Sequence, residues 1–171
     1  EWEFYWKKML HPYDFQSSTL VPDCYGKVPS YWTDYRTLSV QTEKFGYATY
    51  RLIVLLPKGF RKALGMDMPV FDSSYDIYVN GEYHGGNGIP GRTAADSKPE
   101  YNRNFFRVNP TSDTLSIIIN VSNFDHRRGC SGWSKQAEPG AEIYLRHSCL
   151  RSGGNIGKIG DSFIGSDGQP S

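Results

Sequence analysis

The sequence has few histidines and cysteines and no long hydrophobic run. Its three cysteines are an odd number, so at least one thiol is free or paired with another chain, and the spacing fits neither a zinc ribbon nor a redox pair. No two histidines have the spacing of metal ligands. The longest apolar run, residues 52–57, is far shorter than the roughly 20 residues of a membrane-spanning helix. The residues in question are Cys24, Cys130, Cys149, His11, His84, His126 and His147.

An excess of charge of one sign is also absent. The chain has 19 basic and 18 acidic residues and a net charge of +1, which does not favour binding to nucleic acid. Aromatic residues, by contrast, make up 15% of the 171 residues, with 18 glycines and 10 prolines beside them. Many aromatics and turn formers in a chain of this length favour one β-sandwich or barrel domain.

Alternating apolar residues predict several strands and almost no helix. Residues 47–56 are apolar on both faces, as in a buried strand that ends at Pro57. Residues 75–79 and 82–84 flank Asn80-Gly81, a dipeptide typical of tight hairpin turns. Further strands are expected at 114–122 and, more weakly, 141–145, whereas residues 4–10 are either one helical turn or a short strand. The expected fold is all-β.

Two long polar segments, about 85–104 and 125–140, separate these strands, and loops of such length are commonly functional. Residues 86–91 match the glycine pattern of dinucleotide-binding loops. Pro90 lies inside that pattern and no helical period follows, so we interpret it as a glycine-rich turn.

The sequence offers no catalytic residues. No nucleophile, base and orienting group can be assembled from its motifs, and we expect no enzymatic activity of the domain itself. No cofactor is predicted. Asp67, Asp72 and Asp76 allow a structural calcium ion, although solvated surface carboxylates explain them more simply.

Candidate ligand-binding residues lie on the two long loops and at the mouth of the hairpin. Arginine and histidine side chains can hold carboxylates or hydroxyls, and aromatic planes can stack on sugars. The simpler alternative is that the polar groups brace loops and that most aromatics, including Trp2, Phe4, Trp6 and Trp32, fill the core. The predicted ligand-binding residues are Tyr83, His84, Arg92, Asn104, His126, Arg128 and Trp133.

Several motifs follow one another in a characteristic order and spacing, at residues 1–6, 14–15, 28–32, 46–52, 56–57, 74–81, 88–91 and 121–129. Together these segments resemble the extracellular domain of bacterial seven-transmembrane receptors with diverse intracellular signalling modules. The strand motif at 50–52 and the hairpin motif at 78–81 also resemble the sugar-binding jelly-roll domains of β-galactosidase-type glycosidases. Both resemblances imply a galactose-binding-like jelly-roll sandwich, and the receptor resemblance covers residues 1–145. The glycine-rich composition of residues 146–171 indicates a tail or linker.

The receptor resemblance implies a periplasmic sensor domain. It would bind a carbohydrate or another small molecule, would be tethered to the membrane through the rest of a longer chain, and would signal to a cytoplasmic output domain by a shift between two arrangements. Two alternatives stay open, namely a carbohydrate-binding accessory module of a glycosidase and a ligand-free interaction or homodimerisation module. The sequence does not determine the ligand, the output domain, the cysteine pairing, the oligomeric state or the role of the tail.

Overall fold

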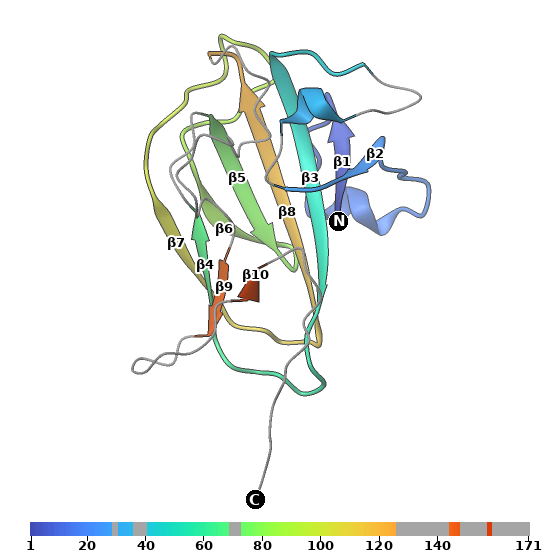
Figure 1. Cartoon of the computed structure of the whole chain (residues 1–171), viewed down its shortest axis with the longest axis vertical. Coiled ribbons are helices and arrows are strands. Elements are labelled where there is room, and N and C mark those ends of the chain that lie inside the picture. Colours follow the sequence, from blue (N-terminus) through green and yellow to red (C-terminus); the bar gives the residue numbers. More distant parts are fainter. Residues whose placement is uncertain (29–30, 36–40, 69–72, 126–143, 148–156, 159–171) are drawn as a thin grey trace, which may run out of the picture.

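The computed structural model describes residues 1–28, 31–35, 41–68, 73–125, 144–147 and 157–158. The described residues form strands and two short 3-10 helices (Figure 1). The strands are β1 (Trp2–Trp6), β2 (Cys24–Gly26), β3 (Gly46–Leu55), β4 (Leu64–Met68), β5 (Ser74–Val79), β6 (Glu82–Asn87), β7 (Asn104–Val108), β8 (Thr114–Asn123), β9 (Tyr144–His147) and β10 (Gly157–Lys158), and the helices are η1 (Pro12–Gln16) and η2 (Trp32–Asp34).

The strands form two antiparallel sheets, which confirms the predicted all-β jelly-roll sandwich. Sheet A has six strands in the order β2-β1-β3-β8-β5-β6, and sheet B has four in the order β10-β9-β4-β7. Strands that are neighbours in space are mostly distant in sequence, as in β3 beside β8, so long-range pairing determines the fold.

The two longest strands, β3 and β8, lie side by side along the molecule (Figure 1) and pair from Gly46–Asn123 to Leu55–Thr114. β3 was predicted because both of its faces are largely apolar and β8 from its apolar alternation, and the structure confirms both strands. The β5–β6 hairpin is confirmed too. Asn80 and Gly81 at its turn have φ values of 49° and 91°, the left-handed conformation that a tight hairpin turn requires.

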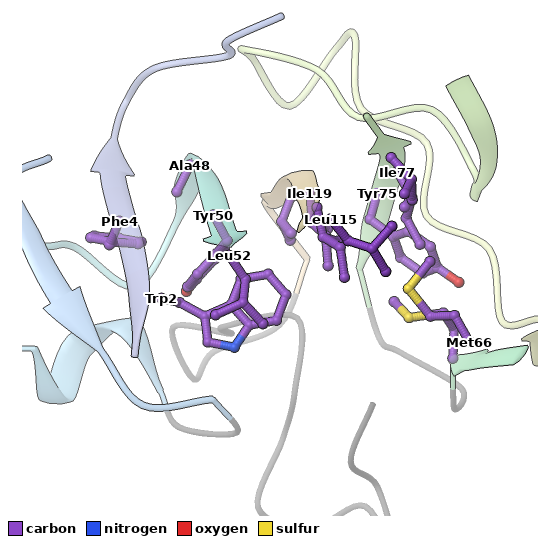
Figure 2. Close-up of a cluster of buried hydrophobic side chains, with 14 of the residues drawn as sticks. Trp2, Phe4, Ala48, Tyr50, Leu52, Met66, Tyr75, Ile77, Leu115 and Ile119 are labelled. Carbon is purple, nitrogen blue, oxygen red and sulfur yellow. The ribbon is translucent and has the colours of Figure 1, made fainter. Parts of the chain in front are cut away.

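The core lies between the sheets and is rich in aromatic rings (Figure 2). Trp2, Phe4 and Trp6 alternate along β1 toward the core, and Trp32 of η2 packs on Trp6 with ring centroids 5.1 Å apart. Sheet B contributes Met66 and the two residues that alternate with it on β4 to the same cluster. The structure therefore confirms the core alternative for these four aromatics rather than a ligand-binding role.

The sequence pattern did not reveal β2, β4 and β7. The predicted last strand, 141–145, is found as β9 at Tyr144–His147, and residues 141–143 lie outside the described residues. The predicted domain boundary after residue 145 falls within β9, and β10 beyond it pairs with β9. The boundary itself stays a prediction. Within the described residues, no helix has the length and apolar character needed to cross a bilayer.

The first predicted loop, 85–104, is more ordered than its composition suggested. β6 continues to Asn87, and Ile89 pairs with Lys98 in an isolated bridge. Below the loop, the Ser122 hydroxyl lies 2.8 Å from the hydroxyls of both Ser74 and Ser97. Because all three serines are buried, this network fixes the loop to sheet A.

Candidate functional site

One group of titratable and aromatic side chains lies on the outer face of sheet A, over the β5–β6 hairpin. Tyr75, Ile77 and Val79 of β5 face the core, so Asp76 and Tyr78 face outward. Tyr83 of β6 and the 3-10 helix η1 complete the group. We call this set the hairpin cluster; its members are His11, Tyr13, Asp76, Tyr78 and Tyr83.

Asp76 is the polar centre of the hairpin cluster. The Tyr83 hydroxyl donates a hydrogen bond to its Oδ1 at 3.2 Å, and His11 is close enough to act on it electrostatically. Nevertheless, burial raises the pKa of Asp76 above its ordinary value of 3.8, because its desolvation outweighs both favourable contacts. A carboxylate kept where burial disfavours its charge is a typical feature of binding and catalytic sites.

Aromatic rings surround this carboxyl group. The rings of Tyr78 and Tyr83 are 5.5 Å apart, and His11 meets Tyr78 edge-on at 5.9 Å. His11 also stacks on Tyr13 at 5.7 Å with an interplanar angle of 5°. Tyr83 is 60% exposed and Tyr13 67% exposed, so one large aromatic ring is open to solvent beside Asp76 and a second beside His11.

The segment that carries His11 and Tyr13 is held on sheet A by buried hydrogen bonds. Asn120 Nδ2 donates to the Leu10 carbonyl at 3.0 Å, and the Leu10 amide donates to Thr49 Oγ1 at 3.0 Å. Asn120 and Thr49 are themselves buried, and Thr49 Oγ1 donates to Asn120 Oδ1 at 2.6 Å. At the start of η1, the His11 amide donates to Asp14 Oδ2 at 2.7 Å. These contacts fix the backbone that presents His11 and Tyr13 to the hairpin.

Gly86 leaves room for the carboxyl group. It pairs with Asp76 in the β5–β6 ladder, and a Cβ atom at this position would lie 2.7 Å from Asp76 Oδ1 and 2.3 Å from the Tyr75 carbonyl oxygen. A side chain at position 86 would therefore displace Asp76. Position 86 consequently places no side chain against Asp76 Oδ1, which accepts its hydrogen bond from Tyr83 of the same strand.

The structure places the predicted site residues of the described part in different surroundings. Tyr83 belongs to the hairpin cluster, and His84 follows it on β6 at the irregular step between Ile77 and Tyr78. Arg92 is exposed on the loop after β6. Asn104 begins β7, where its Nδ2 donates to Tyr75 Oη and to the Gly86 carbonyl, both at 3.1 Å, and thereby links the two sheets.

The remaining predicted ligand residues, His126, Arg128 and Trp133, lie outside the described residues. All seven assignments therefore stay predictions. Of the four that the structure describes, only Tyr83 makes a direct contact with the Asp76 carboxyl group.

The described residues give little support for a metal site or for a reactive thiol. Nowhere in the described ranges do three or more potential metal ligands come together. Asp67 lies on β4 of sheet B and Asp76 on β5 of sheet A, and Asp72 falls in an undescribed range, so the predicted calcium ion stays untested. Cys24 is a half-buried thiol whose pKa is raised to about 11, mainly by burial and then by Asp23, which disfavours the reactive thiolate.

Sequence reasoning missed the other members of the hairpin cluster. Asp76 and Tyr78 alternate with core residues of β5, which is the signal that could have placed them together on the outer face. His11 and Tyr13 gave no such signal, because only the long-range bonds of Leu10 to Thr49 and Asn120 place them there.

The arrangement suits the binding of a polyhydroxylated ligand. An ionised carboxylate accepts hydrogen bonds from hydroxyl groups, and the exposed rings of Tyr13 and Tyr83 offer flat, rigid surfaces with polar edges. These are the two kinds of group that recognise a sugar ring.

Comparison with solved structures finds the same fold within larger enzymes. A β-glucuronidase from Ruminococcus gnavus in complex with N1-substituted uronic isofagomine matches with a TM-score of 0.51 and 15% identity, over 71% of this chain and 21% of that chain. Another structure of Ruminococcus gnavus β-glucuronidase matches with a TM-score of 0.51 and 14% identity, over 71% of this chain and 20% of that one.

These likenesses show the fold alone, because sequence identity is low. No family model matches the chain, and no curated protein matches it. The chain spans about a fifth of the length of the enzymes that it resembles. It is therefore an all-β jelly-roll sandwich of the kind that forms one part of glycosidases.

Proposed function

We propose that this chain is a carbohydrate-binding accessory domain of a larger protein and that the hairpin cluster is its binding site. The observation that supports this most is Asp76, a carboxylate whose charge is disfavoured by burial and which accepts a hydrogen bond from the exposed Tyr83. The exposed ring of Tyr13 stacks on His11 of the same cluster. The shared fold supports the same proposal, since the matched structures contain this sandwich as a minor part of a glycosidase.

A binding role fits the cluster better than catalysis. Glycoside hydrolysis commonly uses two carboxyl groups that flank the scissile bond. The hairpin cluster as defined has one carboxyl group, and its nearest polar partner is the Tyr83 hydroxyl. Asp76 would accept hydrogen bonds from sugar hydroxyls while Tyr83 and Tyr13 stack on the ring. A negative carboxylate at the centre favours neutral over acidic sugars.

The periplasmic receptor role stays a prediction. A jelly-roll fold suits both a receptor ectodomain and a glycosidase accessory domain, and fold alone does not decide function. The accessory role is preferred because the matched structures are glycosidases. Localisation, membrane tethering and homodimerisation likewise stay predictions.

Replacing Tyr83 with alanine is expected to weaken sugar binding about tenfold, or 1.4 kcal/mol. The substitution removes an exposed aromatic plane and the hydroxyl group that holds Asp76. The measurement is titration calorimetry with the neutral oligosaccharide that gives the strongest signal on a glycan array.

The matched control is Tyr25→Ala, since Tyr25 is an equally exposed tyrosine on the edge strand β2. We expect this variant to bind as the wild type does. Equal losses in both variants, or no loss in either, would show that the hairpin cluster is not the binding site.

Asp76→Asn is expected to change how stability depends on pH. Because the folded-state pKa of Asp76 is raised, the native state binds a proton more readily than the unfolded state does. The wild type therefore loses stability as pH rises from near 3.8 through the raised pKa. The asparagine variant lacks this loss, so it should gain stability relative to the wild type over that range.

Urea unfolding of both proteins at a series of pH values measures this difference. Taking the difference between the two proteins cancels, to first order, the titration of the other groups that both contain. If the wild type instead became relatively more stable as pH rose, Asp76 would be an ordinary stabilising carboxylate and the argument from its burial would fail.

A further inference from the structure

The outer face of sheet B carries a second group of aromatic and charged side chains. Leu64, Met66 and Met68 of β4 face the core, so Gly65 and Asp67 face outward. On the neighbouring strand β7, Phe106 and Val108 face inward, and Phe105 and Arg107 face outward. Arg103 directly precedes β7, and its side chain reaches Asp67 on the same outer face. We call these five outward residues the sheet B patch.

The ring of Phe105 lies on the backbone of the neighbouring strand. A Cβ atom at Gly65 would be 2.2 Å from Phe105 Cζ, so the ring occupies the space that any side chain at position 65 would need. Phe105 is nevertheless 61% exposed. The ring is therefore supported from below and open above, which is the arrangement of a stacking platform rather than of a core residue.

Arg103 is fixed beside this platform. Its Nε and Nη2 donate to Asp67 Oδ1 at 3.1 Å and to Oδ2 at 2.7 Å, a two-point contact that holds the guanidinium in one plane. Asp67 is buried, whereas the Arg103 side chain is 68% exposed. The two bonds use two of the five N–H donors of Arg103, and the guanidinium keeps donors for an incoming anion.

The neighbouring positions add positive charge. Arg107 pairs with Gly65 in the β4–β7 ladder and is exposed. On the other side of β4, Arg146 stands opposite Gly65 and Tyr144 opposite Asp67. The sheet B patch itself therefore contains two arginines and one aspartate, and Arg103 already pairs with that aspartate.

We propose that the sheet B patch binds an acidic glycan, that is, a polysaccharide with carboxylate or sulfate groups. Arg103 and Arg107 would pair with the acidic groups while a sugar ring stacks on Phe105. A flat aromatic ring between two cations, one directly before β7 and one on it, suits successive residues of such a chain. The proposal does not rest on the hairpin cluster, which lies on the other sheet and presents a carboxylate.

The test measures binding of oligogalacturonate and of its fully methyl-esterified form, which has the same sugar without the charge. Phe105→Ala and Arg103→Lys are compared with the wild type; lysine keeps a positive charge for Asp67 but loses the two-point geometry. We expect wild type to bind the acidic form, to lose affinity as salt is raised, and to bind the ester at least tenfold more weakly. Each variant should lose about tenfold.

The matched control is Lys58→Ala, which removes an exposed cation outside the patch and should leave affinity unchanged. Melting temperatures establish that the variants are folded. Equal binding of acid and ester, absence of binding to the acidic form, or a loss in Lys58→Ala as large as in Phe105→Ala would overturn the proposal. Equally tight binding of poly-L-glutamate would overturn it as well, because the patch would then recognise negative charge without sugar.

Discussion

Replacing Phe4 with alanine is expected to lower the free energy of unfolding by about 3–5 kcal/mol. Phe4 is fully buried at the centre of β1, and its ring lies 5.0 Å from both the Tyr35 and the Tyr50 rings and 6.1 Å from that of Trp6. Truncation removes these contacts and leaves a cavity that surrounding rings, fixed by their own strands, cannot fill. Urea unfolding measures the change.

Phe45→Ala is the matched control, because Phe45 is a phenylalanine 42% exposed just before β3. We expect it to lower the free energy of unfolding by less than about 1 kcal/mol, as surface substitutions do. A similarly small cost for Phe4→Ala would show that the aromatic rings around Phe4 are loosely packed, and the description of the core would then be wrong.

Gly88→Ala is expected to lower the free energy of unfolding by more than the roughly 1–3 kcal/mol that a backbone strained at positive φ costs alone. Gly88 has φ of 66°, and a Cβ atom there would lie 2.1 Å from the Lys98 carbonyl oxygen. The bridge between Ile89 and Lys98 fixes that carbonyl, so the loop must open to admit a methyl group. Unfolding experiments on the variant measure the cost.

Gly59→Ala separates the two causes, because Gly59 has a similar φ of 75° but nothing within 4 Å of its missing Cβ atom. Its substitution should cost only the backbone strain. If Gly88→Ala cost no more than Gly59→Ala, the close approach between Gly88 and Lys98 would not exist in solution. The expected excess accounts for the glycine at position 88 of the 86–91 pattern by a close backbone approach.

The long strands of sheet A could be predicted because β3 is largely apolar on both faces and the residues of β8 alternate strongly. β3 and β8 carry apolar side chains at every second position, and Asn80-Gly81 marks the hairpin turn. β4 and β7 could not be predicted in the same way. β4 includes Gly65 and Asp67, which are unfavourable in strands, and its stability comes from pairing with β7 and from methionines in the core.

The candidate site was only partly accessible to sequence reasoning. Tyr83 was predicted because it stands at the mouth of a recognisable hairpin. Asp76 was considered only as a calcium ligand, because the burial that raises its pKa depends on the folded sheet. His11 reaches the cluster through bonds of Leu10 to Asn120, 110 residues further along the chain, and no local pattern encodes such a contact.

The most direct test of the central claim is calorimetric titration of a neutral oligosaccharide, selected on a glycan array, into wild type, Tyr83→Ala and Tyr25→Ala. The account predicts that wild type and Tyr25→Ala bind with equal affinity and that Tyr83→Ala binds about tenfold more weakly. Equal affinity in all three proteins, or an array on which no neutral glycan binds, would contradict a sugar-binding role for the hairpin cluster.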